Sequence, residues 1–236
     1  MNIALLTAAG NGSRMHQDIP KQFIHVDNKP VIIYTMEAFQ NHPSIDAIIV
    51  VTLDSWKEVL FSYAKQFNIT KLKWVVSGGE NGQESIFNGL AELHKHISED
   101  DVVMVHDGNR PLVSSEVISD SLAVYHSCGS AVAVVPCTEV VFESEDGVRS
   151  NKAKDRDKLF RTQTPHTYRF GELWSAHEQA AQKKITNTAA SCVLMQLLGE
   201  ETYFSKGSEE NLKITTTDDL KIFKALLSTR QDGWIK

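Results

Sequence analysis

Residues 4–23 read ALLTAAGNGSRMHQDIPKQF, and this stretch decides the class of fold. An apolar segment over residues 3–6 runs directly into a loop of small residues. Two cations follow, Arg14 and then Lys21 behind a proline. Small residues let backbone N–H groups approach a polyphosphate closely, and Arg and Lys match its oxygens. The stretch therefore predicts a strand followed by a phosphate-binding loop.

The same loop lacks two better-known phosphate-binding patterns. No Gly-Lys-Ser/Thr follows, which excludes a P-loop, and Met15 occupies the place of the third glycine of a dinucleotide fingerprint. For Gly10 and Gly12 alone, a plain strand-to-loop turn is an equally good interpretation.

Apolar runs and helical patterns alternate over the first 136 residues. Strands are predicted at 45–52, 72–76, 101–106 and 130–135, and helices at 30–39, 54–66, 83–94 and 115–125. This alternation predicts a mostly parallel sheet with helices on both sides. The loops 8–21, 77–82 and 107–111 all follow strands, so we expect them on one rim, where such sheets bind ligands.

The pattern changes after residue 138. Residues 140–148 resemble a hairpin with an Asp-Gly turn, and a charged stretch follows over 152–158. Such an excursion is either a solvated flap or a dimerisation arm. Helices are expected at 170–181, at 188–198 and from 217 onward, with strands at 202–204 and 211–215. We expect a single domain over 1–236, with the excursion at about 138–160.

Composition narrows the class of function. The chain has 236 residues, is 42% hydrophobic and carries a net charge of −6, which argues against a nucleic-acid partner. No apolar run is long enough to span a membrane and no secretion signal is visible, so we expect a cytoplasmic protein. Cys128, Cys137 and Cys192 form no metal-binding pattern and are expected to be small buried hydrophobes.

Asp107 is the first candidate for chemistry away from the opening loop. It ends an apolar strand and is followed at once by Gly108. A carboxylate there could bind Mg²⁺, which prefers oxygen ligands and bridges to phosphates. A turn or helix-cap role is the alternative. His106 is more often a structural histidine at such a place, and Arg110 suits either a phosphate or an ion pair.

Two further segments fit a nucleotide at the same rim. In SGGENGQES (77–85) paired glycines would let the backbone close over a base or ribose, and Glu80 could accept from ribose hydroxyls. Lys213 lies within the apolar stretch NLKIT, where an ammonium is costly unless it reaches an anion. An edge strand with Lys213 pointing outward is as common an arrangement.

Taken together, these segments resemble one family, the cytidylyltransferases that activate sugar-alcohol phosphates. It includes the 2-C-methyl-D-erythritol 4-phosphate cytidylyltransferases and the D-ribitol-5-phosphate cytidylyltransferases. The resemblance covers nearly the whole chain, and the joint order and spacing of its motifs are specific. The motifs are AAGNGSRM with PKQF, SGGENGQES, VHDGNRP, RTQTPHTYR and NLKITTTDDLKI.

The resemblance implies an α/β, Rossmann-like fold with a mostly parallel sheet flanked by helices, and a protruding β-hairpin arm that joins a homodimer. It implies CTP and a polyol phosphate as substrates and Mg²⁺ as cofactor. Arg14, Lys21 and Lys213 would be catalytic and Asp107 would hold the metal. CTP would contact Ala8, Ala9, Gly10, Gly12, Ser13, Gly79, Glu80, Ser85 and Gly108. The acceptor side would include Glu139, Val140, Asn187 and, reaching into the neighbouring subunit, Arg156.

The chain departs from the family pattern at three places. Asn187 stands where an aspartate usually follows threonine, Val140 replaces a threonine after Glu139, and Gly82 aligns with a common arginine. These departures leave most of the residues implied to bind CTP unchanged, whereas they put the identity of the acceptor substrate in doubt. RTQTPHTYR, NLKITTTDDLKI and the turn at 143–147 are closer to the ribitol-phosphate branch.

The leading hypothesis is a Mg²⁺-dependent cytidylyltransferase acting on D-ribitol 5-phosphate, with 2-C-methyl-D-erythritol 4-phosphate as the alternative acceptor. A sugar-1-phosphate nucleotidyltransferase is a rival, although its Gly-Gly-x-Gly-Thr-Arg loop is absent. The three departures motivate a non-catalytic CTP-binding module. A Rossmann oxidoreductase is disfavoured because the third glycine is missing.

Overall fold

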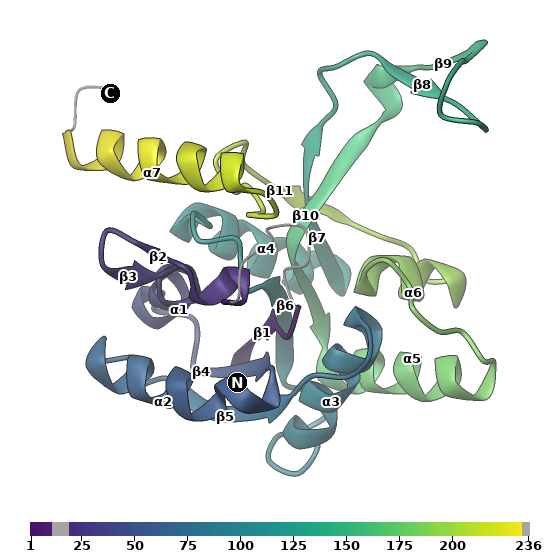
Figure 1. Ribbon diagram of the computed structural model, residues 1–236. Helices are drawn as coiled ribbons and strands as arrows, with labels where there is room; N and C mark the ends of the chain where they lie inside the picture. Colours follow the sequence, from purple (N-terminus) through teal and green to yellow (C-terminus); the bar gives the residue numbers. More distant parts are fainter. Residues whose placement is uncertain (11–18, 233–236) are drawn as a thin grey trace.

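A seven-stranded sheet forms the centre of the molecule, in the order β11-β7-β10-β6-β1-β4-β5 (Figure 1). The computed structural model describes residues 1–10 and 19–232, with side chains through 229. The strands are β1 (Asn2–Ala8), β4 (Ala47–Thr52), β5 (Leu72–Ser77), β6 (Val102–Asp107), β7 (Ser130–Pro136), β10 (Phe160–Arg169) and β11 (Phe204–Lys206). Strand β1 lies between β4 and β6, so the order reverses there and a crevice opens at the carboxyl ends.

The predicted mostly parallel sheet is confirmed. Strand β1 pairs in parallel with β4 and β6, and β4 with β5. Strand β10, which runs antiparallel between β6 and β7, was not predicted. Residues 163–168 of β10 are all buried although several are polar, so no alternation of polar and apolar residues marks the strand.

Alternate residues of the central strands face two helical layers. Ala4 and Leu6 of β1 pack with α1 (Val31–Asn41), α2 (Lys57–Gln66) and α4 (Ser115–Cys128). Ile3 and Leu5 pack with α3 (Gly82–Leu93) and α5 (Phe170–Gln182). These strands are apolar throughout because both of their faces are covered. The predicted three-layer α/β architecture is confirmed.

Local signals fix where helices begin and end beside the crevice. The Asn81 side chain accepts a hydrogen bond from the backbone N–H of Glu84 at 3.0 Å and caps α3. Ser114 caps α4 in the same way through the N–H of Val117. Gly129 ends α4 in the left-handed region at φ 88°. Capping by Asn81 therefore holds the 77–82 loop between the carboxyl end of β5 and the start of α3.

The excursion after β7 is an arm that stands away from the sheet at the upper right of Figure 1. Its strands β8 (Val141–Glu143) and β9 (Lys152–Lys154) pair antiparallel, followed by the turn η4 (Arg156–Lys158). The prediction of a tight hairpin over 140–148 was therefore wrong in its second strand. The charged stretch supplies that strand, and Gly147 (φ 69°) lies within the longer connecting loop.

The predicted strand at 211–215 was also wrong. These residues are an irregular segment before α7 (Thr217–Asp232), held beside the 107–111 loop. The N–H of Ile214 donates to the carbonyl of Asn109 at 2.9 Å, and Arg110 donates to the carbonyl of Asn211 at 2.6 Å. Tertiary hydrogen bonds, rather than a sheet ladder, therefore position Lys213.

The remaining elements are short. They are η2 (Lys21–Phe23), β2 (His25–Val26), β3 (Lys29–Pro30), η3 (Asp54–Trp56) and α6 (Ser191–Leu197). Helix α6 starts three residues later than predicted, and Pro30 is the N-cap of α1 rather than its first helical residue.

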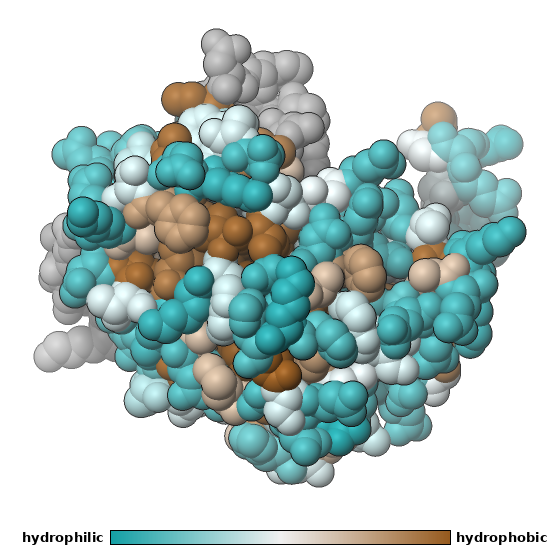
Figure 2. Space-filling view, turned by 90° about the horizontal axis from the view of Figure 1, so that it is seen from below, coloured by the Kyte–Doolittle hydropathy of each residue, from teal (hydrophilic) through white to brown (hydrophobic). Residues whose placement is uncertain are grey.

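The surface seen in Figure 2 is mainly hydrophilic, with one group of hydrophobic side chains in its left half. Helix α2 lies in that half of the molecule and leaves Val59 and Phe61 partly exposed. Single exposed apolar side chains are normal on soluble proteins. None of the helices described here is both apolar enough and long enough to cross a lipid bilayer.

Candidate active site

The three loops expected on one rim do meet there. They enclose a space of about 410 Å³, called the loop cavity below. Most of the predicted nucleotide-binding residues line it, namely Ala8, Ala9, Gly10, Lys21, Gly79, Glu80 and Ser85, together with Asp107 and Lys213. Gly12, Ser13 and Arg14 lie outside the described residues. The loop cavity thus gathers small residues, two lysines and two carboxylates at the sheet's switch point.

Close backbone approach shapes the loop cavity. A Cβ added at Gly78 would lie 2.2 Å from the Cβ of Ala9. The 77–82 loop can therefore approach the opening loop this closely only with glycine at position 78. The buried Gln22 side chain donates to the carbonyls of Ala8 and Gly10 and holds the start of the opening loop. Gln22 was not predicted. No sequence signal separates it from a surface glutamine, because its role depends on the turn η2.

Asp107 is the charged centre of the rim. One carboxylate oxygen accepts from Lys213 Nζ at 2.8 Å, and the other accepts from Arg110 Nε at 2.9 Å. Burial alone would raise the pKa of Asp107, but the charges of Lys213 and Arg110 and their hydrogen bonds hold it well below its usual range. The carboxylate is therefore ionised at neutral pH.

A buried histidine supports this centre from behind. The N–H of Asp107 donates to the Thr164 hydroxyl at 3.0 Å, and that hydroxyl lies 3.0 Å from His106 Nδ1. His106 Nε2 lies 3.2 Å from the carbonyl of Arg110, which can only accept. Burial lowers the pKa of His106 to about 3, so the ring is neutral with its proton on Nε2. His106 is thus a positioning residue, as its place at a strand end indicated.

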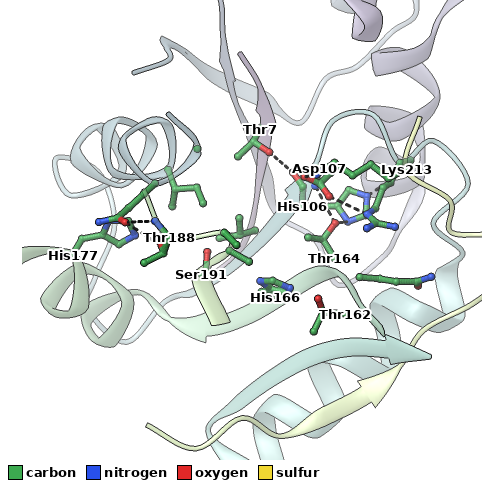
Figure 3. Close-up of a pocket in the computed structure, with 18 residues that line it drawn as sticks. Thr7, His106, Asp107, Thr162, Thr164, His166, His177, Thr188, Ser191 and Lys213 are labelled. Carbon is green, nitrogen blue, oxygen red and sulfur yellow. Dashed lines mark hydrogen bonds and ion pairs between the residues drawn. The ribbon is translucent and has the colours of Figure 1, made fainter. Parts of the chain in front are cut away.

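A second space of about 330 Å³, the β10 cavity, adjoins the loop cavity (Figure 3). The two share Thr7, Gly82, Asp107 and Lys213. Strand β10 supplies Thr162, Gln163, Thr164 and His166 to the β10 cavity, and the loop before α6 supplies Thr188, Ala189, Ala190 and Ser191. This wall of the β10 cavity was not predicted from the sequence, because strand β10 itself was not predicted.

Five predicted residues lie elsewhere. Gly108 lines neither cavity, and its N–H donates to the carbonyl of Thr7 at 2.9 Å while its carbonyl accepts from Thr35. Asn187 (φ 55°) is exposed beside α3 and α5, and its neighbour Thr188 faces the β10 cavity instead. The other three, Glu139, Val140 and Arg156, belong to the arm and line neither cavity.

The donor set for a metal is sparse. Within residues 1–10 and 19–232, no group of three or more His, Cys, Asp or Glu side chains could hold a metal ion. Asp107 is an ionised carboxylate at the junction of the two cavities. One carboxylate fits a Mg²⁺ whose other ligands are phosphate oxygens and water, and does not fit a metal held by protein alone.

A mostly parallel sheet with a small-residue loop, two lysines and the ionised Asp107 at its switch point defines a nucleotide-binding α/β protein. The family model described as 2-C-methyl-D-erythritol 4-phosphate cytidylyltransferase matches residues 2–229. The chain belongs to this family, and it is a nucleotidyltransferase of the cytidylyltransferase type.

Relatives of both acceptor types are similar to the chain over nearly its whole length. A ribitol-5-phosphate cytidylyltransferase of Lacticaseibacillus paracasei is 42% identical over 233 residues, which cover 98% of this chain and 100% of the relative. A 2-C-methyl-D-erythritol 4-phosphate cytidylyltransferase of Clostridium acetobutylicum is 39% identical over 233 residues, covering 96% and 97%.

Solved structures agree on the fold. The 2-C-methyl-D-erythritol 4-phosphate cytidylyltransferase of Francisella tularensis superposes with a TM-score of 0.80 at 27% identity, covering 95% of this chain and 98% of that one. The 4-diphosphocytidyl-2C-methyl-D-erythritol synthase of Anaerococcus prevotii gives 0.81 at 22% identity, covering 96% of each chain. The predicted Rossmann-like fold is confirmed.

Proposed function

We propose that this enzyme transfers CMP from CTP to D-ribitol 5-phosphate, giving CDP-ribitol and pyrophosphate. The observation that carries the proposal is the junction of two cavities at Asp107 and Lys213. The loop cavity has the small-residue backbone suited to a nucleoside triphosphate, and the β10 cavity has the hydroxyl and imidazole groups suited to a polyol. A phosphate from each side would meet at the shared residues.

Transfer of CMP requires that the two substrates be positioned and that positive charge stabilise the reacting phosphates, and it requires no side-chain nucleophile. An oxygen of the acceptor phosphate attacks the α-phosphorus of CTP, a new P–O–P bond forms, and the bond to the β-phosphate oxygen breaks so that pyrophosphate leaves. Lys21 lines the loop cavity, where it would neutralise triphosphate oxygens. Lys213 stands at the junction, where it would stabilise charge on the α-phosphate.

Asp107 and Arg110 prepare Lys213 for that role. The ion pair with Asp107 holds the ammonium at the junction before substrates bind, and Arg110 keeps the carboxylate in place from the other side. Asp107 would also supply the protein ligand of a Mg²⁺ that arrives with the triphosphate. When bound, the ion would neutralise phosphate charge.

We further propose that the enzyme is a homodimer joined through its arms. Val140 and Phe142 are 65% and 63% exposed on the arm, and the tilted rings of Phe160 and Phe204 contact each other at its base with centroids 5.0 Å apart. Apolar groups exposed together in this way favour a protein partner. The arm also keeps Arg156 away from both cavities of its own chain, which fits a role at the neighbouring subunit.

The choice of ribitol 5-phosphate rests on the relatives and on the motifs closer to that branch. The relatives named for it are 42% and 39% identical, against 39% for one named for the methylerythritol substrate. Pyrophosphate release from CTP should therefore be faster with D-ribitol 5-phosphate than with 2-C-methyl-D-erythritol 4-phosphate. The opposite order would assign the chain to the alternative acceptor, and no release with either would contradict the proposal.

A further inference from the structure

Buried polar atoms without a partner gather at the β10 cavity. Six side-chain atoms in the described part of the chain are buried and lack a hydrogen-bond partner. Three belong to residues that line the β10 cavity, namely His166 Nε2, His177 Nε2 and Ser191 Oγ. Buried polar groups are nearly always satisfied in native proteins, so their concentration at one cavity indicates that a ligand completes them.

Two other hydroxyls of this cavity, those of Thr164 and Thr188, are already engaged. Thr164 serves Asp107 and His106, as described above. The Thr188 hydroxyl donates to Gln83 Oε1 at 3.0 Å, which also accepts from the N–H of Thr188. Among the buried residues that Figure 3 labels between Asp107 and His177, His166 and Ser191 therefore keep polar atoms for a ligand.

The bonding of His166 decides which group it can recognise. Its Nε2 lines the β10 cavity, is buried and has no hydrogen-bond partner. Burial lowers the pKa of His166 to about 4, which keeps the ring neutral near pH 7. In a neutral imidazole, Nε2 either donates through its N–H or accepts through its lone pair. A hydroxyl satisfies Nε2 in either case, because a hydroxyl can both donate and accept.

Ser191 complements that preference. Its side chain is 3% exposed at the first residue of α6, and its hydroxyl can donate or accept. Lys213 and Arg110 place positive charge at the Asp107 end of the cavity, whereas His166 and Ser191 are uncharged. A ligand with a phosphate at one end and hydroxyls along its chain matches this order of groups.

On the basis of the proposed function, we propose that His166 and Ser191 determine acceptor specificity. His166 Nε2 forms a hydrogen bond with one hydroxyl of the polyol phosphate, and Ser191 Oγ pairs with another. Substrates with the phosphate but without those hydroxyls leave both side chains buried and unsatisfied, and are selected against.

The test uses His166→Phe and Ser191→Ala in the full-length enzyme, with D-ribitol 5-phosphate and CTP as substrates. We expect the KM for D-ribitol 5-phosphate to rise about 10- to 100-fold in each variant, with the KM for CTP unchanged. His166→Gln keeps a side-chain group that can donate or accept in the cavity, and should recover part of the loss.

Matched controls remove the same kind of atom elsewhere. Ser205→Ala and Tyr168→Phe delete buried, unpartnered hydroxyls that do not line the β10 cavity. Both should leave the two KM values unchanged. An equal rise of the acceptor KM in these controls would mean that the effect is structural, and would overturn the assignment.

Acceptors lacking one hydroxyl at a time give a readout that misfolding cannot imitate. One such deoxyribitol 5-phosphate should bind about 10-fold less well to wild type and lose nothing further with His166→Phe. If every analogue binds more weakly than D-ribitol 5-phosphate by the same factor in wild type and in His166→Phe, His166 forms no hydrogen bond with a substrate hydroxyl. If wild type turns over no polyol phosphate, the proposed function fails and this inference with it, whereas turnover with unaltered acceptor KM in both variants overturns the inference alone.

Discussion

The rim of the sheet and the arm differ in how their functional side chains are held. Asp107 is fixed by Lys213 and Arg110, and its side chain is 17% exposed. Arg156 on the arm is 56% exposed and donates to the carbonyl of Thr138. The rim therefore completes its geometry within one chain. The arm presents charged and apolar groups outward, an arrangement that a second subunit would complete.

The same contrast separates two kinds of site residue. Those of the rim come from β1, β5, β6 and the segment before α7, which the sheet order brings together. Those of the arm line neither cavity of their own chain, and the arm stands away from the sheet (Figure 1). Substitutions at the rim should thus affect chemistry directly, and substitutions on the arm should act across subunits.

The largest effect is expected at the rim lysines. Lys21→Ala and Lys213→Ala should each lower kcat about 100- to 1000-fold, because each removes a charge that stabilises the transferring phosphate. Steady-state pyrophosphate release measures this loss. Lys65→Ala on the outer surface of α2 is the control and should keep wild-type rates. A wild-type kcat in either rim variant would remove that lysine from the reaction.

A smaller effect should follow from the arm. Arg156→Ala should raise the KM for the acceptor about 10- to 100-fold, since a charged hydrogen bond to phosphate is lost, and should leave the KM for CTP unchanged.

Mixing two impaired variants tests whether this contact crosses the dimer, at an acceptor concentration well below the wild-type KM, where each variant alone is nearly inactive. When Lys213→Ala and Arg156→Ala chains exchange, one of the two sites in each mixed dimer regains both side chains, so about a quarter of wild-type activity should return. Mixing that restores nothing would place Arg156 in its own subunit or outside the site.

Two glycines of the 77–82 loop differ in the space that an added side chain would find. Gly78→Ala should lower the free energy of unfolding by about 1–3 kcal/mol, because the new methyl group would overlap Ala9. Gly82→Ala starts α3 with nothing within 4 Å of the added Cβ, and should be close to neutral. Urea denaturation with both variants gives the comparison. Equal stabilities would show that the two loops separate without cost.

The smallest effect concerns pH. Burial lowers the pKa of His177 to about 4, against 6.5 in the unfolded chain, so the unfolded state takes up a proton first as the pH falls. This histidine therefore favours unfolding progressively from about pH 6.5 down to about 4, by about 1–2 kcal/mol at pH 5. His177→Gln should flatten the fall in stability between pH 7 and 5. His126→Gln on the exposed end of α4 should not, and a profile for His177→Gln that follows wild type would contradict the assignment.

Much of the rim could be predicted because its signals are local. Three parts of the rim each follow an apolar strand: the small-residue loop after β1, the glycines after β5, and Asp107 at the end of β6. The carboxyl ends of parallel strands share one edge, so finding the strands was enough to bring these residues together. The β10 wall could not be found this way, because His166 and Thr164 are polar yet buried by neighbours from β6 and β7.

By itself, the sequence determined the α/β class, the three loops of the rim and its carboxylate Asp107, because each depends on periodicity or on a residue next to a strand end. Only the tertiary structure decided that Lys213 lies in an irregular segment paired with Asp107, that Thr188 rather than Asn187 faces the β10 cavity, and that His166 presents an unpartnered Nε2 there. These outcomes depend on hydrogen bonds between residues far apart in the chain, such as that between Lys213 and Asp107, and no local pattern encodes such partners.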